Sequence, residues 1–420
     1  MESPGGRVAR ILGWVACALS AALLTAPLHG QDAPQPMFSF RGFGTLGIVH
    51  SSEKDADFVA NSSSQPSGAG FSRGWSADVD SRLGAQVTAN FTAKISAVVQ
   101  IVSEQRADGT YTPHVEWANL KYQFTPELYV RVGRIALPSF LLADYRKVGY
   151  ANPWVRPPIE VYSLVPVTTN DGADASYRLV AGEFTSTLQV TYGQCDIDET
   201  VGVVDSARRV WGVSGTVERG PVTVRATYQH GNVTVRSINP LFAGFRQFGP
   251  PGVALADRYD SDARPFDFVG AGVLYDAGRW FATGEWGMTE SHSAIGKRSA
   301  WYFGGGYRFG KLTPTLTYAE AELDSNSSDP GLNAAFFPPE YGPTIAGLNA
   351  GLNTILRSPP VQRTLSVGVR WDFMNDVDFK VQVDHIRLGA GSAGTLVNVQ
   401  PGFRPGGTVN VLSAALDFVF

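Results

Sequence analysis

Residues 408–420 read Thr-Val-Asn-Val-Leu-Ser-Ala-Ala-Leu-Asp-Phe-Val-Phe, and the stretch ends the chain on an aromatic residue. Its second half places an apolar residue at every other position: Leu412, Ala414, Leu416, Phe418 and Phe420. Successive side chains of an extended strand point to opposite faces, so the stretch predicts a strand with one apolar face. The same period of two recurs in residues 184–192, 222–229 and 364–373. This pattern predicts antiparallel strands with one apolar and one polar face.

Turn residues divide the chain into sixteen such strands, with short and long connections alternating. The predicted strands span residues 38–50, 76–90, 91–106, 113–124, 128–137, 171–181, 184–195, 207–218, 222–234, 264–276, 280–291, 299–309, 312–324, 362–373, 378–390 and 408–420. The long connections lie near residues 51–75, 107–112, 138–170, 196–206, 235–263, 292–298, 325–361 and 391–407.

Strand length and aromatic placement favour a membrane barrel over a soluble sandwich. Many predicted strands run to about 10–13 residues, whereas strands of soluble sheets average roughly 5–6. Aromatic residues such as Trp280, Trp371 and Phe418 stand near predicted strand ends, as in the girdles of outer-membrane barrels. We therefore predict an all-β fold, a 16-stranded antiparallel transmembrane β-barrel. A barrel of this width encloses water, because side chains cannot fill it.

The N-terminus has the features of a secretory signal peptide. Arg7 and Arg10 precede an apolar run from Ile11 to Leu24, which is too short to span a membrane comfortably. We predict a signal peptide over residues 1–30, a short N-terminal segment over 31–37 and the barrel over 38–420. The formal net charge of −4 shows no basic excess of the kind that binds nucleic acid.

The 138–170 connection is too apolar for an exposed loop, and folding it into the lumen would bury its apolar side chains. Its charges could then cross the pore: Asp144, Arg146, Lys147, Arg156 and Glu160. Acidic loop groups opposite basic wall groups would create a transverse field; the predicted wall residues are Arg82, Lys94, Arg131 and Arg134. The alternative is that these loop charges pair with one another and anchor the loop.

Residues 116–134, which end in Val132-Gly133-Arg134, precede this long connection. Together with Phe40-Arg41-Gly42-Phe43-Gly44 and the terminal Phe420, they resemble the Gram-negative general porin family. The resemblance implies a water-filled channel for passive diffusion of small hydrophilic solutes and ions, with a third loop folded into the lumen. It also implies an outer-membrane location among lipids and lipopolysaccharide, and a homotrimer. The last strand looks like the signal that the barrel-assembly machinery recognises, carried by Leu412, Ala414, Leu416, Phe418 and Phe420. The third loop lacks the Pro-Glu-Phe-Gly signature of enteric porins.

Two other functions stay open at this point. One is a substrate-specific porin with a binding constriction, and the other is a loop-sealed barrel with a structural or adhesin role. We expect no enzymatic activity and no cofactor or metal. The histidines after residue 30 show no metal-ligand spacing, and a lone Cys195 in that region is not a nucleophile motif.

Overall fold

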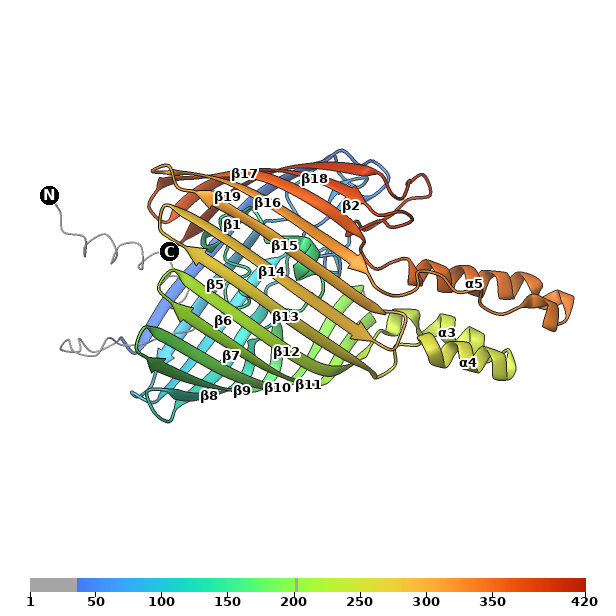
Figure 1. Ribbon diagram of the computed structural model, residues 1–420, viewed down its shortest axis with the longest axis horizontal. Coiled ribbons are helices and arrows are strands. Elements are labelled where there is room, and N and C mark those ends of the chain that lie inside the picture. Colours follow the sequence, from blue (N-terminus) through green and yellow to red (C-terminus); the bar gives the residue numbers. More distant parts are fainter. Residues whose placement is uncertain (1–35, 201–202) are drawn as a thin grey trace.

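The computed structural model describes residues 36–200 and 203–420. The signal peptide predicted for residues 1–30 lies outside the described residues. The described chain forms a closed barrel with helices projecting beyond one end, and the C-terminus lies at the opposite end (Figure 1).

Sixteen long strands make the wall, as the sequence predicted. They are β1 (Phe38–Ser51), β5 (Arg82–Asn90), β6 (Ile95–Glu104), β7 (His114–Gln123), β8 (Leu128–Ala136), β9 (Thr169–Ala181), β10 (Phe184–Thr200), β11 (Val203–Arg219), β12 (Val222–Thr234), β13 (Arg264–Asp276), β14 (Trp280–Ser291), β15 (Lys297–Tyr307), β16 (Leu312–Leu323), β17 (Gln362–Met374), β18 (Val377–Leu388) and β19 (Thr408–Val419). Each pairs antiparallel with the next, and β1 pairs with both β5 and β19, which closes the sheet.

The period of two separates an outer from an inner face. In β19, Leu412 is 38% exposed, whereas the neighbouring Ser413 is fully buried. Apolar groups face outward and polar groups inward because a lipid-facing charge costs roughly 2–4 kcal/mol at the bilayer midplane.

The seam between first and last strands is closed by aromatic rings over glycines. Phe418 lies opposite Gly44 in the register, and the backbone N–H of Gly42 donates to the Phe420 carbonyl at 2.8 Å. A β-carbon at Gly42 or Gly44 would overlap the ring of Phe420 or Phe418, respectively. Glycine is therefore required where these rings cross the seam.

Several predicted boundaries differ from the structure. The loop predicted at 196–206 is wrong, because β10 continues to Thr200 and β11 begins at Val203. Polar residues there broke the membrane pattern, but a strand that has left the bilayer no longer needs an apolar face. The strands predicted from residues 76 and 91 begin later, at Arg82 and Ile95.

The first long connection, between β1 and β5, contains three two-residue strands. They are β2 (Asp57–Phe58), β3 (Ala69–Gly70) and β4 (Trp75–Ser76). β4 pairs with β1, while β2 pairs with β3, so this connection folds back onto the barrel mouth.

Two other long connections form a helical arm, which we define as α3 (Asn239–Arg246), α4 (Gly249–Tyr259) and α5 (Gly342–Leu356). A small apolar core holds it together and includes Phe242, Phe245, Ile345 and Leu352. The arm extends beyond the barrel (Figure 1). None of the helices in the described parts of the chain is both long and apolar enough to cross a membrane.

Candidate functional site

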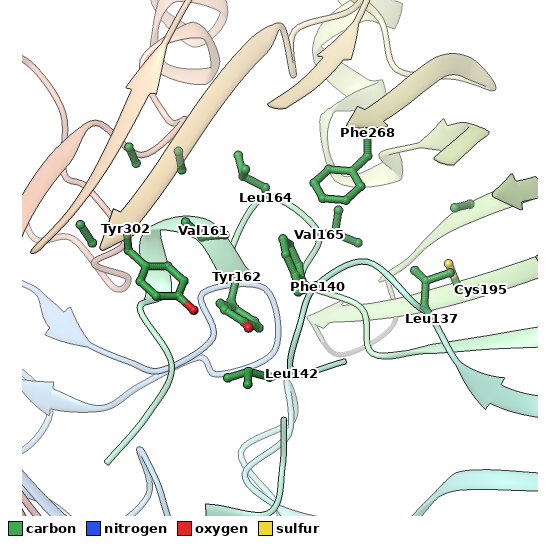
Figure 2. Packing of buried hydrophobic residues seen from close by; sticks show 14 of the residues in the cluster. Leu137, Phe140, Leu142, Val161, Tyr162, Leu164, Val165, Cys195, Phe268 and Tyr302 are labelled. Carbon is green, nitrogen blue, oxygen red and sulfur yellow. The ribbon is translucent and has the colours of Figure 1, made fainter. Parts of the chain in front are cut away.

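The connection between β8 and β9, residues 137–168, is the third loop. It includes a short helix, α2 (Ile159–Tyr162), and a single 3-10 turn, η1 (Gly149–Ala151). Its apolar side chains form one cluster with inward-facing residues of the wall (Figure 2). The Phe140 ring lies 4.6 Å from the Tyr162 ring and 5.3 Å from that of Phe268 on β13, measured between ring centroids. The loop is therefore packed against the inside of the wall.

Hydrogen bonds fix the same part of the loop to strands β12 to β16. Trp154 donates its indole N–H to the Thr317 hydroxyl at 2.8 Å. Glu285 on β14 accepts from the Tyr162 hydroxyl at 2.5 Å and from the backbone N–H of Leu141 at 2.7 Å. Because these wall residues lie on the polar face, the loop crosses the barrel interior rather than covering its outside.

Arg156 joins the loop to two distant parts of the barrel. Its guanidinium donates to Asp80, just before β5, at 2.6 and 2.9 Å, to Asp384 on β18 at 3.0 Å and to the Ser413 hydroxyl at 2.6 Å. The side chain is only 5% exposed. Burial alone would lower the pKa of Arg156, but the two carboxylates outweigh it and raise that pKa. The group therefore stays charged as a fixed cross-link.

Lys147 forms a second anchor, to strands β6 and β7. Its ammonium lies 2.5 Å from Glu104 on β6 and 2.7 Å from Glu116 on β7. Burial acts to lower the pKa of Lys147, yet the two glutamates overcome this and raise it. Lys147 therefore neutralises one of the two negative charges of Glu104 and Glu116.

Further loop contacts involve an acid and the carbonyls of the η1 turn. Glu160 accepts from Gln362 at 2.6 Å and from the Thr364 hydroxyl, with no ion-pair partner among the described residues. Burial raises the pKa of Glu160. On the same side, Lys380 donates to the Gly149 carbonyl at 2.7 Å and Arg370 to the Tyr150 carbonyl at 2.7 Å.

A cavity of about 290 Å³ remains between the third loop and the wall that runs from β5 to β10. Arg146, Lys147 and Arg156 line it from the loop. From the wall it is lined by charged and polar groups that include Arg82, Glu104, Gln105, His114, Glu116, Arg134 and Asp171. The lumen is thus closed by packing on the β13–β16 side and open, with a charged lining, on the other.

A closed sixteen-stranded wall with an internal third loop is the architecture that the sequence resemblance implied. The sequence model of the Gram-negative porin family matches residues 15–404. The chain belongs to the Gram-negative porin family. It is accordingly an outer-membrane channel for the passive diffusion of small solutes. A search of curated proteins returned no match.

Solved porin structures share the fold at low sequence identity. The anion-selective porin from Comamonas acidovorans superposes with a TM-score of 0.52 at 13% identity, covering 91% of this chain and 99% of that one. OmpF of Salmonella typhi, in a complex with daunomycin, gives 0.54 at 12% identity, over 91% and 97%. OmpT of Vibrio cholerae gives 0.50 at 10% identity, over 94% and 100%. At these identities the likeness concerns the fold alone.

The predicted wall residues of this porin lie in different environments. Arg82 faces the cavity, and its guanidinium lies 3.9 Å from Glu104. Arg134 lines the cavity, 2.6 Å from Asp171 and 39% exposed. Arg131 is instead held by Asp174 at 2.5 Å with little exposure. Lys94 is misplaced in the prediction, because β6 begins at Ile95 and Lys94 lies in the exposed turn before it.

The loop charges pair in the opposite sense to the expected one. We expected acidic loop groups opposite basic wall groups, whereas the ion pairs join the loop cations Lys147 and Arg156 to wall acids. Asp144 is half-buried and interacts electrostatically with Tyr129, Arg131 and Tyr145. Arg146 donates to the carbonyls of Tyr162 and Val165 and stacks over the Tyr162 ring.

Sequence reasoning missed the wall acids Glu104, Glu116 and Glu285. A bulge between β6 and β7 falls beside Glu116, so the parity of that segment could not be read. Glu285 carried a signal, since it is an acid between Gly284 and Trp286 in a strand that is otherwise rich in apolar residues. No group of three or more His, Cys, Asp or Glu residues that could hold a metal occurs in the described ranges.

Proposed function

We propose that small hydrophilic solutes and ions cross this porin through the cavity between the third loop and the β5–β10 wall. The observation that carries the proposal is the contrast between the two sides of the loop. On the β13–β16 side, apolar rings and hydrogen bonds leave little space, whereas the other side keeps a cavity of about 290 Å³ lined by ionised groups. Charged lining lowers the electrostatic cost for a hydrated ion to enter a narrow passage.

The lining supports weak selectivity for anions. Most of its charges are already paired, as Lys147 is with two glutamates and Arg134 is with Asp171. Arg146 differs, because its hydrogen bonds within the described residues go to uncharged carbonyls. A cation without an acid partner attracts anions, while the paired charges around it largely cancel.

The direct test is ion conduction by the purified protein in planar bilayers. We expect stepwise conductance, and a reversal potential in a potassium chloride gradient that indicates a modest preference for chloride. Arg146→Gln should move the reversal potential toward cation preference. Arg279→Gln, which removes a cation from an exposed short turn, should leave it unchanged. Absence of any conductance step would overturn the channel proposal and favour a loop-sealed barrel with a structural role.

We also propose that residues 1–30 are removed on export and that the mature chain forms a homotrimer in contact with lipopolysaccharide. The outward row Leu412, Ala414, Leu416, Phe418 and Phe420 would serve as the signal for the barrel-assembly machinery. Deleting Phe420 should leave unfolded protein in the periplasm, measured by fractionation and protease sensitivity. Chemical cross-linking of outer membranes should yield a trimer band; a monomer alone would contradict the assembly.

A further inference from the structure

The cavity contains two guanidinium groups with spare N–H donors. Arg82 donates to the Asp80 carbonyl at 3.3 Å, and its closest carboxylate, Glu104, is 3.9 Å away. Arg146 bonds only weakly, at 3.2 and 3.5 Å, to two carbonyls. Burial lowers the pKa of Arg146, and electrostatic repulsion from the Arg82 guanidinium lowers it further. Two such cations facing one space can share a single anionic group through charge-assisted hydrogen bonds.

The same cavity is lined by Gln105, a buried side chain whose acceptor atom has no partner among the described residues. Gln105 is only 4% exposed, and its Oε1 accepts no hydrogen bond among the described residues. Buried polar atoms in native proteins nearly always have partners, so a solute or water that donates a hydrogen bond fits here.

The charges nearest to Gln105 select the ligand further. Arg82, Arg146 and Lys147 lie there with Glu104 and Glu116, whereas Arg134, Arg156 and Asp196 of the same lining have ion-pair partners of their own. These five side chains together carry an excess of one positive charge, which suits a monoanion. The two carboxylates would repel the second charge of a phosphate dianion.

We infer that this cavity is a binding site for small hydroxycarboxylates on their way through the channel. The carboxylate would lie between Arg82 and Arg146, and the hydroxyl would donate to the amide oxygen of Gln105. At about 290 Å³ the site is at the lower limit of small-molecule pockets, so it suits solutes of a few carbon atoms. The inference rests on the proposed function, because the solute must enter by the same route.

The test compares three solutes with the same carbon skeleton, namely lactate, propionate and alanine. Ion current through the trimer in planar bilayers is measured as each solute is raised at constant potassium chloride. We expect lactate to reduce the chloride current with saturation, at a concentration several-fold below that for propionate. Alanine, which is a zwitterion, should have a weaker effect than lactate.

Variants separate binding from loop packing. Arg82→Gln removes a binding group that makes no bond to the third loop, and it should abolish saturation by lactate. Gln105→Leu should remove the difference between lactate and propionate, while Arg279→Gln serves as the unchanged control. Arg146→Gln should weaken lactate binding as well, and susceptibility of the third loop to protease reports whether that variant keeps the loop in place.

The outcomes distinguish this inference from the proposed function. Stepwise conductance with no saturation by lactate would overturn the site and leave the channel intact. Equal or stronger saturation by alanine or propionate would overturn the choice of a hydroxylated monoanion. Saturation that persists in Arg82→Gln would show that lactate acts elsewhere. No conductance at all would instead refute the proposed function.

Discussion

Replacing Arg156 with methionine tests whether the third loop is held in place by its buried ion pairs. The change preserves much of the side-chain length but leaves Asp80 and Asp384 facing each other without their cation. Removing one partner of a buried pair costs about 3–5 kcal/mol. At about 1.4 kcal/mol per factor of ten, the equilibrium between docked and released loop would shift by roughly two to four orders of magnitude.

The barrel itself should survive this change, because sixteen strands pair independently of the loop. We therefore expect Arg156→Met to keep its heat-modifiable mobility on gels while the loop becomes cleavable by protease and single-channel conductance rises. The matched control is the triple variant in which Asp80 and Asp384 also become asparagine. It removes the unpaired acids and should recover a large part of the wild-type behaviour. Wild-type conductance and protease resistance in Arg156→Met would refute the anchoring role.

Two further substitutions probe the loop and the seam. Burial raises the pKa of Glu160 above its ordinary value of about 4.5. Its contribution to the stability of the docked loop is therefore greatest below about pH 4.5, where the acid is protonated, and is lost as the pH rises through the raised pKa. Glu160→Gln should therefore protect the third loop from protease at pH 8 but not at pH 4; equal protection at both would contradict a buried carboxylate. Gly44→Val should place a side chain against the Phe418 ring and reduce the yield of folded barrel, seen as loss of the heat-modifiable form. Gly215→Val on β11, where an added β-carbon meets nothing within 4 Å, should not.

The wall could be read from the sequence because each strand repeats the same constraint. A lipid-facing side chain must be apolar and its neighbour can be polar, so the signal recurs sixteen times and single errors do not accumulate. The signal fails where the constraint ends. Residues 196–200 continue β10 beyond the predicted strand, but their polar composition has no lipid to avoid and reads as a loop.

The helical arm was missed for a different reason. Its connections contain many Gly and Pro residues, which indicate loops when taken singly. Ile345, Leu348, Leu352 and Ile355 nevertheless recur at intervals of three and four, which is the period of an amphipathic helix. Pro250 and Pro343 stand in the first turn of their helices, where proline is tolerated. The helical periodicity is present in the sequence, but the Gly and Pro residues favoured the prediction of a loop.

The pairing of charges could not be derived in the same way. Arg156 and Asp384 are separated by 228 residues, and nothing local states which wall group a loop cation meets. Composition identified the loop cations, but no local pattern pairs them with particular wall acids. The path of the loop across the lumen decides which of these residues meet.

That path also changes which residues control permeation. Glu160, which accepts hydrogen bonds from Gln362 and Thr364 on β17, lies away from the open cavity and holds the loop, while the proposed route runs along β5–β10. Along the proposed route, Arg82 and Arg146 would oppose Glu104 and Glu116, with which Lys147 forms ion pairs. A loop cation that serves as an anchor has little charge left for passing ions, since its partners neutralise it. Ion selectivity should therefore respond most to substitution of residues whose charge is not neutralised by a partner. Among the loop cations that line the cavity, this criterion selects Arg146 over Lys147 and Arg156.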